Sequence, residues 1–217
     1  MAETHDWLTL SEAKKVLSAK ASASNSDGVI ASVISAASRT LDKAVGPAVR
    51  RVVVDEVHSG GGRSVELRSG PVYSISSVVE YQHGSATTLT LNAPGTYPTN
   101  GYHAAPYKPQ PELNLRSGLL FRTYTGHRGT FWCMDDNIVV NYVGGRYADT
   151  ASVDARFKEA CKVVVKNWFR MYEASVGVPL GGELPMPTQS FPTYAIPNAA
   201  RLMLRDVWQS YVGFGAS

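Results

Sequence analysis

The stretch NIVVNYVGGRYADTASVDARFKEACKVVVKNWFRMYE, residues 137–173, decides the fold because two kinds of periodicity meet in it. Residues 137–145 alternate with a period of two, which is typical of a strand. Further along, apolar side chains that include Phe157 and Trp168 recur at helical spacing, with lysine and arginine on the other sides. The stretch therefore predicts a strand that leads through a glycine-containing turn into a helix over residues 153–174.

Two helices are predicted before the strands. The sequence TLSE at residues 9–12 is a capping box, in which threonine and glutamate satisfy two exposed backbone N–H groups, and it begins a helix over residues 9–19. A stripe of aliphatic side chains then predicts a second helix over residues 27–45. Gly46 and Pro47 end this helix, because glycine fits the left-handed cap position and proline cannot continue the helix.

The region of residues 49–147 is predicted to be β. Its strand-like stretches are residues 49–57, 63–69, 72–81, 86–92, 118–124 and 137–145. The glycine-rich residues 59–62 predict a hairpin between the first two of them. Residues 93–111 carry five prolines and three tyrosines, so we expect a long excursion from the sheet there.

The C-terminal part differs in composition from the rest. Residues 176–197 contain five prolines and three glycines, which excludes regular structure, and a final helix is predicted over residues 198–211. Helices and strands thus come in runs, which predicts an α+β fold with a mostly antiparallel sheet. We divide the chain into a core of residues 1–176 and an extended C-terminal arm of residues 177–217.

Composition excludes several classes of protein. Charged residues make up 18% of the chain, below the usual quarter, and the net charge of +3 is too small for a nucleic-acid-binding footprint. Two cysteines do not form a disulfide framework, and Cys161 is predicted to be a buried thiol on the apolar face of a helix. No signal peptide and no apolar stretch of about 20 residues is present, so we expect no membrane contact.

The sequence contains few candidates for catalytic or metal-binding residues. The five histidines lack the spacing of metal ligands, and the glycine-rich segments lack the features of a phosphate-binding loop. One alternative that remains is a small hydrolase or nuclease using His127, Cys133 or the Asp135–Asp136 pair. Another is a single-strand nucleic-acid binder at FRTYTGHRGTFW, residues 121–132, where aromatic rings alternate with cations. We expect no catalytic activity, no metal and no cofactor.

Three patterns together carry a family resemblance. The first is LTLSEAKKVL followed by DGVIASVISAASRTLDKAVG, the second is LRSGPVYSISSV at residues 67–78, and the third is residues 137–173. In this order and spacing they resemble the head–tail connector (adaptor, or head-completion) proteins of long-tailed bacteriophages. The segments of residues 93–111 and beyond residue 178 match no pattern of that family.

The resemblance implies a structural role in the virion. A connector of this family forms a ring, expected here to be dodecameric, that docks beneath the portal and extends the DNA channel. It presents its other face to a tail-side head-completion or tail-terminator protein, and genomic DNA passes through without sequence-specific binding. Assembly takes place in the cytoplasm of the bacterial host. The alternative within the same setting is another junction component, a stopper or a tail terminator; these are β-rich, so ordered helices before the sheet count against them.

Two sets of contact residues are predicted on this basis. Portal binding is assigned to the C-terminal segment, because arginine and aromatic residues dominate interface energies. Its members are Arg201, Leu202, Leu204, Arg205, Trp208, Tyr211 and Phe214. The alternative for this segment is a final helix that packs on its own subunit. Subunit contacts are assigned to Ser74, Ser76, Val78, Tyr97, Tyr102 and Tyr107. Along residues 72–81 we expect the face with Tyr73, Ile75 and Val79 to be buried against the helices. The serine-bearing face is expected to lie against a neighbouring subunit or to face solvent.

Overall fold

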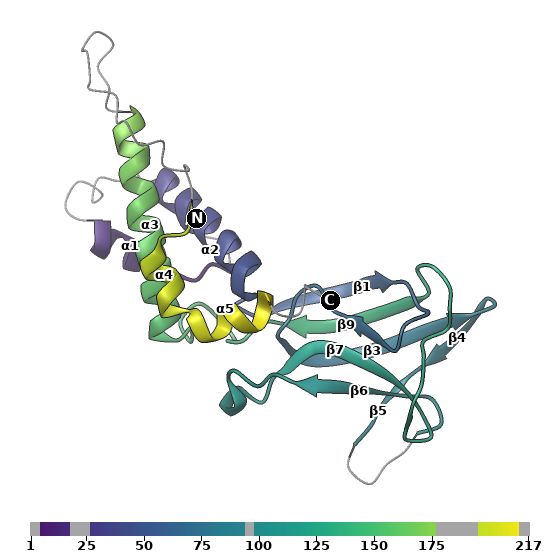
Figure 1. The fold of residues 1–217 in the computed structure, drawn as a ribbon. Helices are drawn as coiled ribbons and strands as arrows, with labels where there is room; N and C mark the ends of the chain where they lie inside the picture. The colour runs from purple at the N-terminus through teal and green to yellow at the C-terminus, as the bar shows by residue number, and fades with distance from the viewer. Residues whose placement is uncertain (1–4, 18–26, 94–97, 177–194, 213–217) are drawn as a thin grey trace. The chain divides into compact units, whose positions relative to one another are not determined.

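The computed structural model describes residues 5–17, 27–93, 98–176 and 195–212, and for residues 173–176 and 209–212 it describes the backbone alone. The chain forms two compact units, one of Met1–Val49 with Asp149–Ser217 and one of Arg50–Ala148 (Figure 1). The first unit is helical and the second is made of strands. The α+β prediction, with a helix after the last strand, is confirmed.

The helical unit begins as its capping signals predict. Helix α1 (Leu10–Leu17) is preceded by Thr9, whose N–H donates to Glu12 Oε2 at 2.8 Å, while the Glu12 N–H donates to Thr9 Oγ1 at 3.2 Å. Helix α2 (Asp27–Val45) ends at Gly46, which has a φ of 80° and donates its N–H to the Asp42 carbonyl. Both predicted helices are present; the end predicted for the first, residues 18–19, lies outside the described residues.

The core of this unit lies between α1, α2 and the long helix α3 (Ala155–Val176). Fully buried side chains on α2 face fully buried side chains on α3, and the ring of Trp7 lies 5.4 Å from that of Phe157. The Trp7 indole also donates to Asp42 Oδ1 at 2.8 Å, an oxygen that accepts the Ala48 N–H as well. Cys161 is fully buried here, as predicted, and burial raises the pKa of its thiol.

The C-terminal helices pack on the same unit. Helix α4 (Asn198–Met203) contacts α3, and α5 (Arg205–Val212) contacts α2. The predicted single helix is thus two short ones, because Leu204 leaves the helical conformation and its N–H donates to the carbonyls of Arg201 and Leu202. The break leaves the Leu204 side chain fully buried.

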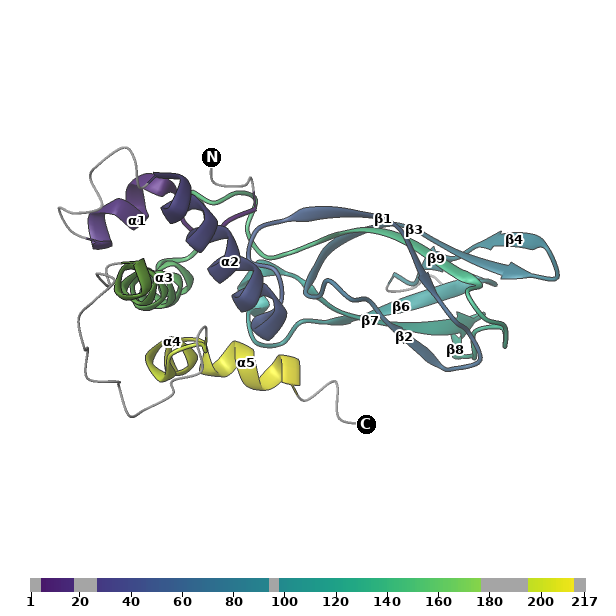
Figure 2. The same ribbon diagram turned by 90° about the horizontal axis from the view of Figure 1, so that it is seen from above.

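The second unit is a sheet whose strand order is β1-β9-β3-β7-β6-β5, with β2 and β8 paired to β7 and β4 paired to β3. Figure 2 shows β1, β9 and β3 in one layer and β7, β2 and β8 in another. The pairs are antiparallel except β5 with β6. The strands are β1 (Arg51–His58), β2 (Ser64–Glu66), β3 (Val72–Gln82), β4 (Ser85–Thr88), β5 (Thr90–Leu91), β6 (Gly101–Pro106), β7 (Arg116–Tyr124), β8 (His127–Arg128) and β9 (Ile138–Gly144).

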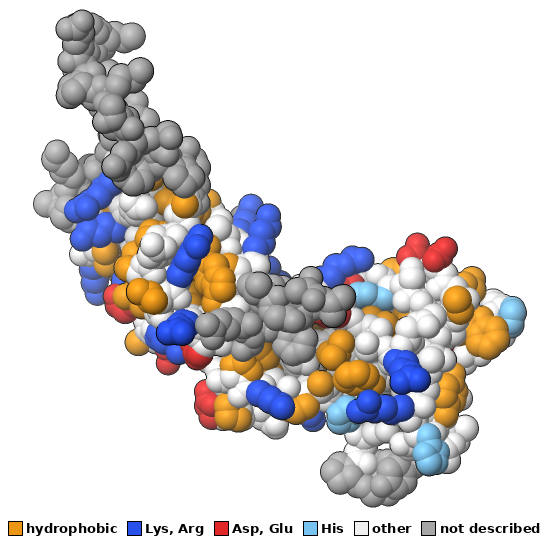
Figure 3. All heavy atoms as spheres, viewed as in Figure 1, with side chains coloured by type: hydrophobic (Ala, Val, Ile, Leu, Met, Phe, Trp, Pro, Cys, Tyr) orange, Lys and Arg blue, Asp and Glu red, His pale blue; other side chains and the backbone are white. Residues whose placement is uncertain are grey.

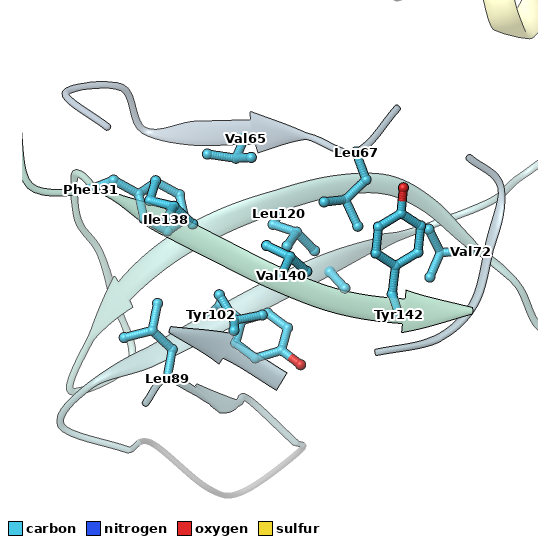
Figure 4. Close-up of a cluster of buried hydrophobic side chains, with 12 residues drawn as sticks. Val65, Leu67, Val72, Leu89, Tyr102, Leu120, Phe131, Ile138, Val140 and Tyr142 are labelled. Carbon is cyan, nitrogen blue, oxygen red and sulfur yellow. The ribbon is translucent and has the colours of Figure 1, made fainter. Parts of the chain in front are cut away.

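A hydrophobic cluster fills the space between the layers (Figure 4). Its members come from both layers and from the connections between them. They are Val65, Leu67, Val72, Val78, Leu89, Tyr102, Ala104, Leu120, Phe131, Ile138, Val140 and Tyr142. Burial of this apolar surface is the main force that holds the layers together.

The predicted hairpin at residues 59–62 is wrong. Strand β1 pairs with β9 and β2 pairs with β7, so the glycine-rich segment connects two separate pairings. Gly60 and Gly61 donate their N–H groups to backbone carbonyls of residues 131–134, and a Cβ on Gly60 would collide with the Trp132 carbonyl. The glycines therefore allow close backbone contact with that loop, which a two-strand turn would not require.

The predicted excursion of residues 93–111 is also wrong in part. Residues 101–106 form β6, which pairs with β7 on one side and β5 on the other. The reason is the position of the prolines: residues 101–105 contain none, so their N–H groups can join the sheet, and Pro106 ends the strand. Residues 94–97 lie outside the described part.

The structure buries different residues of β3 from those predicted. Val72, Val78 and Glu80 are buried, while Tyr73 and Tyr81 are 47% and 40% exposed. Two register irregularities, between residues 72 and 74 and between residues 75 and 77, shift the alternation along the strand. Simple alternation therefore fails twice within one strand.

Candidate functional site

The groups that could have supported catalysis do not form a site. His127 lies at the end of the short strand β8, Cys133 is exposed, and no hydrogen bond joins them in the described part of the chain. Asp135 and Asp136 are exposed in a turn. Among the described residues no group of three or more His, Cys, Asp or Glu side chains is placed to hold a metal ion. This arrangement gives no support to a hydrolytic mechanism.

One candidate surface is the outer side of the β1-β9-β3 layer. Val53, Tyr142 and Ile75 lie opposite one another in the register and belong to the core side. Their neighbours Val52, Val143 and Ser74 also lie in one row and point the other way, since side chains alternate along strands. A further row of this kind is formed by Val57, Val139 and Val79.

We call these two rows, together with Tyr73, Ser76, Ser77, Tyr81 and Asn141, the outer sheet face. None of these side chains carries a charge, and Val52 is 74% exposed. The guanidinium carbon of Arg50 lies 3.3 Å from the centre of the Tyr73 ring at the edge of the face. A partly apolar sheet face of this kind, bordered by Arg50 and the exposed Asp55, fits a protein–protein contact.

The residues predicted for subunit contacts divide between this face and the interior. Ser74 and Ser76 are exposed on the outer sheet face, as expected. Val78 and Tyr102 belong to the hydrophobic cluster, and their side chains are therefore unavailable to a neighbouring subunit. Tyr97 lies outside the described residues.

Tyr107 is also buried, and it has a structural role in the sheet unit. Its hydroxyl accepts a hydrogen bond from Arg146 Nη2 at 2.7 Å, and Arg146 Nε donates to Gln110 Oε1 at 2.9 Å. Arg146 is 1% exposed. The tyrosine thus satisfies a buried cation, so its assignment to a subunit contact is corrected.

The interior of the sheet unit holds a buried ion pair that sequence reasoning missed. Arg122 Nε donates to Glu80 Oε2 at 3.1 Å, and both side chains are 0% exposed. Arg122 also donates to the Gly101 carbonyl and to Asn100 Oδ1, and the other Glu80 oxygen accepts the N–H of Trp132. The pair therefore joins β3, β7 and the segment that enters β6.

A second polar cluster lies on the core side of β1. Glu56 accepts hydrogen bonds from the Arg68 N–H and the Tyr142 hydroxyl and lies 2.7 Å from His58 Nε2. Burial alone would raise the pKa of the Glu56 carboxyl, but these hydrogen bonds outweigh it and lower the pKa below its usual value. Burial and the Glu56 contact raise the pKa of Tyr142. The cluster holds the connection between β2 and β3 in place.

The second candidate surface is a pocket on the C-terminal helices. It has a volume of about 420 Å³ and is lined by Asn198, Arg201, Leu202, Arg205 and Trp208. Four of these five residues belong to the set predicted for portal binding, and Asn198 is the one that the sequence did not single out. Leu204, another member of that set, is buried against the helices of its own unit. The Tyr211 side chain and Phe214 lie outside the described part.

No known protein family and no curated protein matches the sequence. A chain of a solved structure, described as the neck of an empty GTA particle computed with C6 symmetry, has a similar fold with a TM-score of 0.53 at 10% sequence identity. GTA stands for gene transfer agent, a phage-like particle. The similarity covers 92% of this chain and 88% of that one, so it includes both units. None of the described helices combines the length and apolar character needed to cross a bilayer.

Proposed function

We propose that this chain is a non-enzymatic subunit of the head–tail connector of a phage-like virion. The observation that carries the proposal is the similarity of fold, over 92% of the chain, to a chain from the neck of a GTA particle. The resemblance of the sequence to phage connectors supports the same conclusion from different data. A role in the junction needs surfaces for neighbours rather than a reaction centre.

In this proposal the subunits form a ring through heterologous contacts, in which one surface of a subunit meets a different surface of the next. The outer sheet face is one of these surfaces, because it combines exposed Val52 with small, uncharged side chains at Ser74 and Ser76. The sixfold symmetry of the GTA neck is compatible with a dodecamer, since a ring of twelve copies contains a sixfold axis.

The ring docks beneath the portal, extends the DNA channel and joins the capsid to the tail through a tail-side head-completion protein. The C-terminal helices are the proposed portal contact, because Arg201, Leu202 and Arg205 are exposed there. Genomic DNA passes through without sequence-specific contacts, which agrees with a net charge of only +3. A stopper or tail-terminator role is less well supported, because the chain has the ordered helix α2 before its sheet.

The test is a mass measurement by light scattering on the purified full chain, alone and mixed with the portal protein of the same particle. We expect a ring-sized species, or a complex that migrates with the portal. A chain that stays monomeric and ignores the portal at high concentration would overturn the proposal and reduce the comparison to a likeness of fold.

A further inference from the structure

The pocket on α4 and α5 combines two kinds of chemistry. Arg201 and Arg205 lie on either side of the break at Leu204, and both are exposed and line the pocket. Leu202 is 70% exposed, and the guanidinium carbon of Arg201 lies 5.5 Å from the centre of the Trp208 ring. Figure 3 shows hydrophobic and cationic side chains intermixed over the helices of this unit.

The charges of the pocket are of one sign. Neither Arg201 nor Arg205 forms an ion pair with another described residue. The neighbouring carboxylate, Asp206, accepts two hydrogen bonds of 2.9 Å from Arg156 and does not line the pocket. A carboxylate of a bound partner would complement the two arginines, which pair with none among the described residues.

The apolar part of the lining indicates what else a bound segment must contain besides a carboxylate. Trp208 and Leu202 form a surface that an aliphatic or aromatic side chain would cover, and a pocket of about 420 Å³ is large enough for a few side chains. Tryptophan and arginine are the residues that contribute most to protein–protein binding. Nucleic acid fits less well, because two cations line the described part of the pocket and exposed Asp206 lies next to Arg205 in the chain.

We propose that this pocket binds an acidic, apolar segment of a partner protein, with a carboxylate between Arg201 and Arg205 and an apolar side chain against Leu202 and Trp208. The inference rests on the proposed function for the identity of the partner, which would be another protein of the head–tail junction. The chemistry of the pocket rests on the residues that line it and not on the proposed function.

The experiment selects a displayed library of random short peptides on the full chain. We expect enrichment of sequences in which Asp or Glu lies beside Leu, Ile or Phe. The best peptide is then synthesised and its affinity measured for the wild type, for Arg201→Gln/Arg205→Gln and for Leu202→Ser. The arginine variant should lose affinity on the order of tenfold or more, because it removes charge-assisted hydrogen bonds.

A matched control is Lys166→Gln/Arg170→Gln, which removes two exposed cations four residues apart on α3, outside the pocket. It should leave the affinity unchanged. No enrichment, enrichment without acidic residues, or equal loss in the control would overturn the inference. Fluorescent single-stranded and duplex oligonucleotides are measured in parallel, and binding to them that depends on Arg201 and Arg205, without selection of acidic peptides, would assign the pocket to nucleic acid instead.

The mass of the wild-type chain, alone and with the portal protein, is measured alongside, so that failure of the pocket inference can be told apart from failure of the proposed function. A ring-sized wild-type chain that selects no acidic peptide removes the pocket inference alone. A chain that selects acidic peptides but forms no ring and ignores the portal removes the proposed function and keeps the pocket.

Discussion

The side-chain amide of Asn141 donates a hydrogen bond of 3.0 Å to the hydroxyl of Ser77, and this bond crosses from β9 to β3 on the outer sheet face. On its other side Asn141 accepts the N–H of Asp55 at 2.7 Å. Asp55 has a φ of 52° and lies in the irregularity of β1, while Ser77 borders an irregularity of β3. The Asn141 side chain thus forms a hydrogen bond to each neighbouring strand, β1 and β3, at the place where the register of that strand is irregular.

Replacing Asn141 with Ala removes both hydrogen bonds and should therefore lower the free energy of unfolding by about 2 kcal/mol, since each bond of this kind contributes about 1 kcal/mol net. Urea denaturation measures the change. The matched control is Ser74→Ala on the same face, where the exposed hydroxyl has no hydrogen bond to another described residue. An equal effect of the two substitutions would contradict the role given to Asn141.

The Glu80–Arg122 pair predicts a much larger effect. Arg122→Met should cost about 3–5 kcal/mol of unfolding free energy, because it leaves a fully buried carboxylate without its partner. The double variant Glu80→Gln/Arg122→Met should recover part of that loss, since the remaining amide is neutral. Denaturation curves of the single and double variants decide this, and a double variant less stable than Arg122→Met would show that the pair acts in another way.

The lowered pKa of Glu56 predicts an acid-dependent stability. A carboxyl with a depressed pKa in the folded chain stabilises the fold above its unfolded pKa of about 4.5, and this contribution is lost as the pH falls through the lower, folded value. Glu56→Gln should therefore flatten the fall in unfolding free energy below about pH 4.5. Glu66→Gln, which replaces an exposed carboxylate on β2, is the control and should not flatten it to the same extent.

The predictions that succeeded depend on local signals. The capping box of Thr9 and Glu12 and the stop at Gly46 act within one or two turns of helix, so α1 and α2 could be identified from the sequence. Most of the longer strands could be identified as well, with β6 as an exception, but their partners could not. Pairing of β1 with β9 joins residues 80 or more positions apart, and nothing local encodes it.

The predicted site residues were also affected by contacts between residues far apart in the sequence. From the sequence alone Glu80 is expected on the surface, because a carboxylate is seldom buried without a partner. Its partner in the core, Arg122, lies 42 residues further along the chain. Val78 was assigned to a subunit contact because simple alternation along β3 does not reveal its two register irregularities. Tyr102 was assigned to one because the strand that contains it, β6, was not predicted. The pocket on the C-terminal helices could be anticipated in its Arg and Trp content, but its shape depends on the break at Leu204.

The outer sheet face carries the prediction on assembly. Val52→Asp places a charge in the row of Val143 and Ser74, where burial against a neighbouring subunit would leave it unpaired, so the ring should be lost or its formation should require far higher concentration. Because Val52 is 74% exposed in the single chain, the urea midpoint should stay close to that of the wild type. Leu91→Asp on β5, at the other end of the strand order, is the matched control and should keep its ring. Light scattering of both variants, with and without the portal protein, gives the answer. A Val52→Asp chain that still assembles at the wild-type mass would exclude this face from the subunit contact.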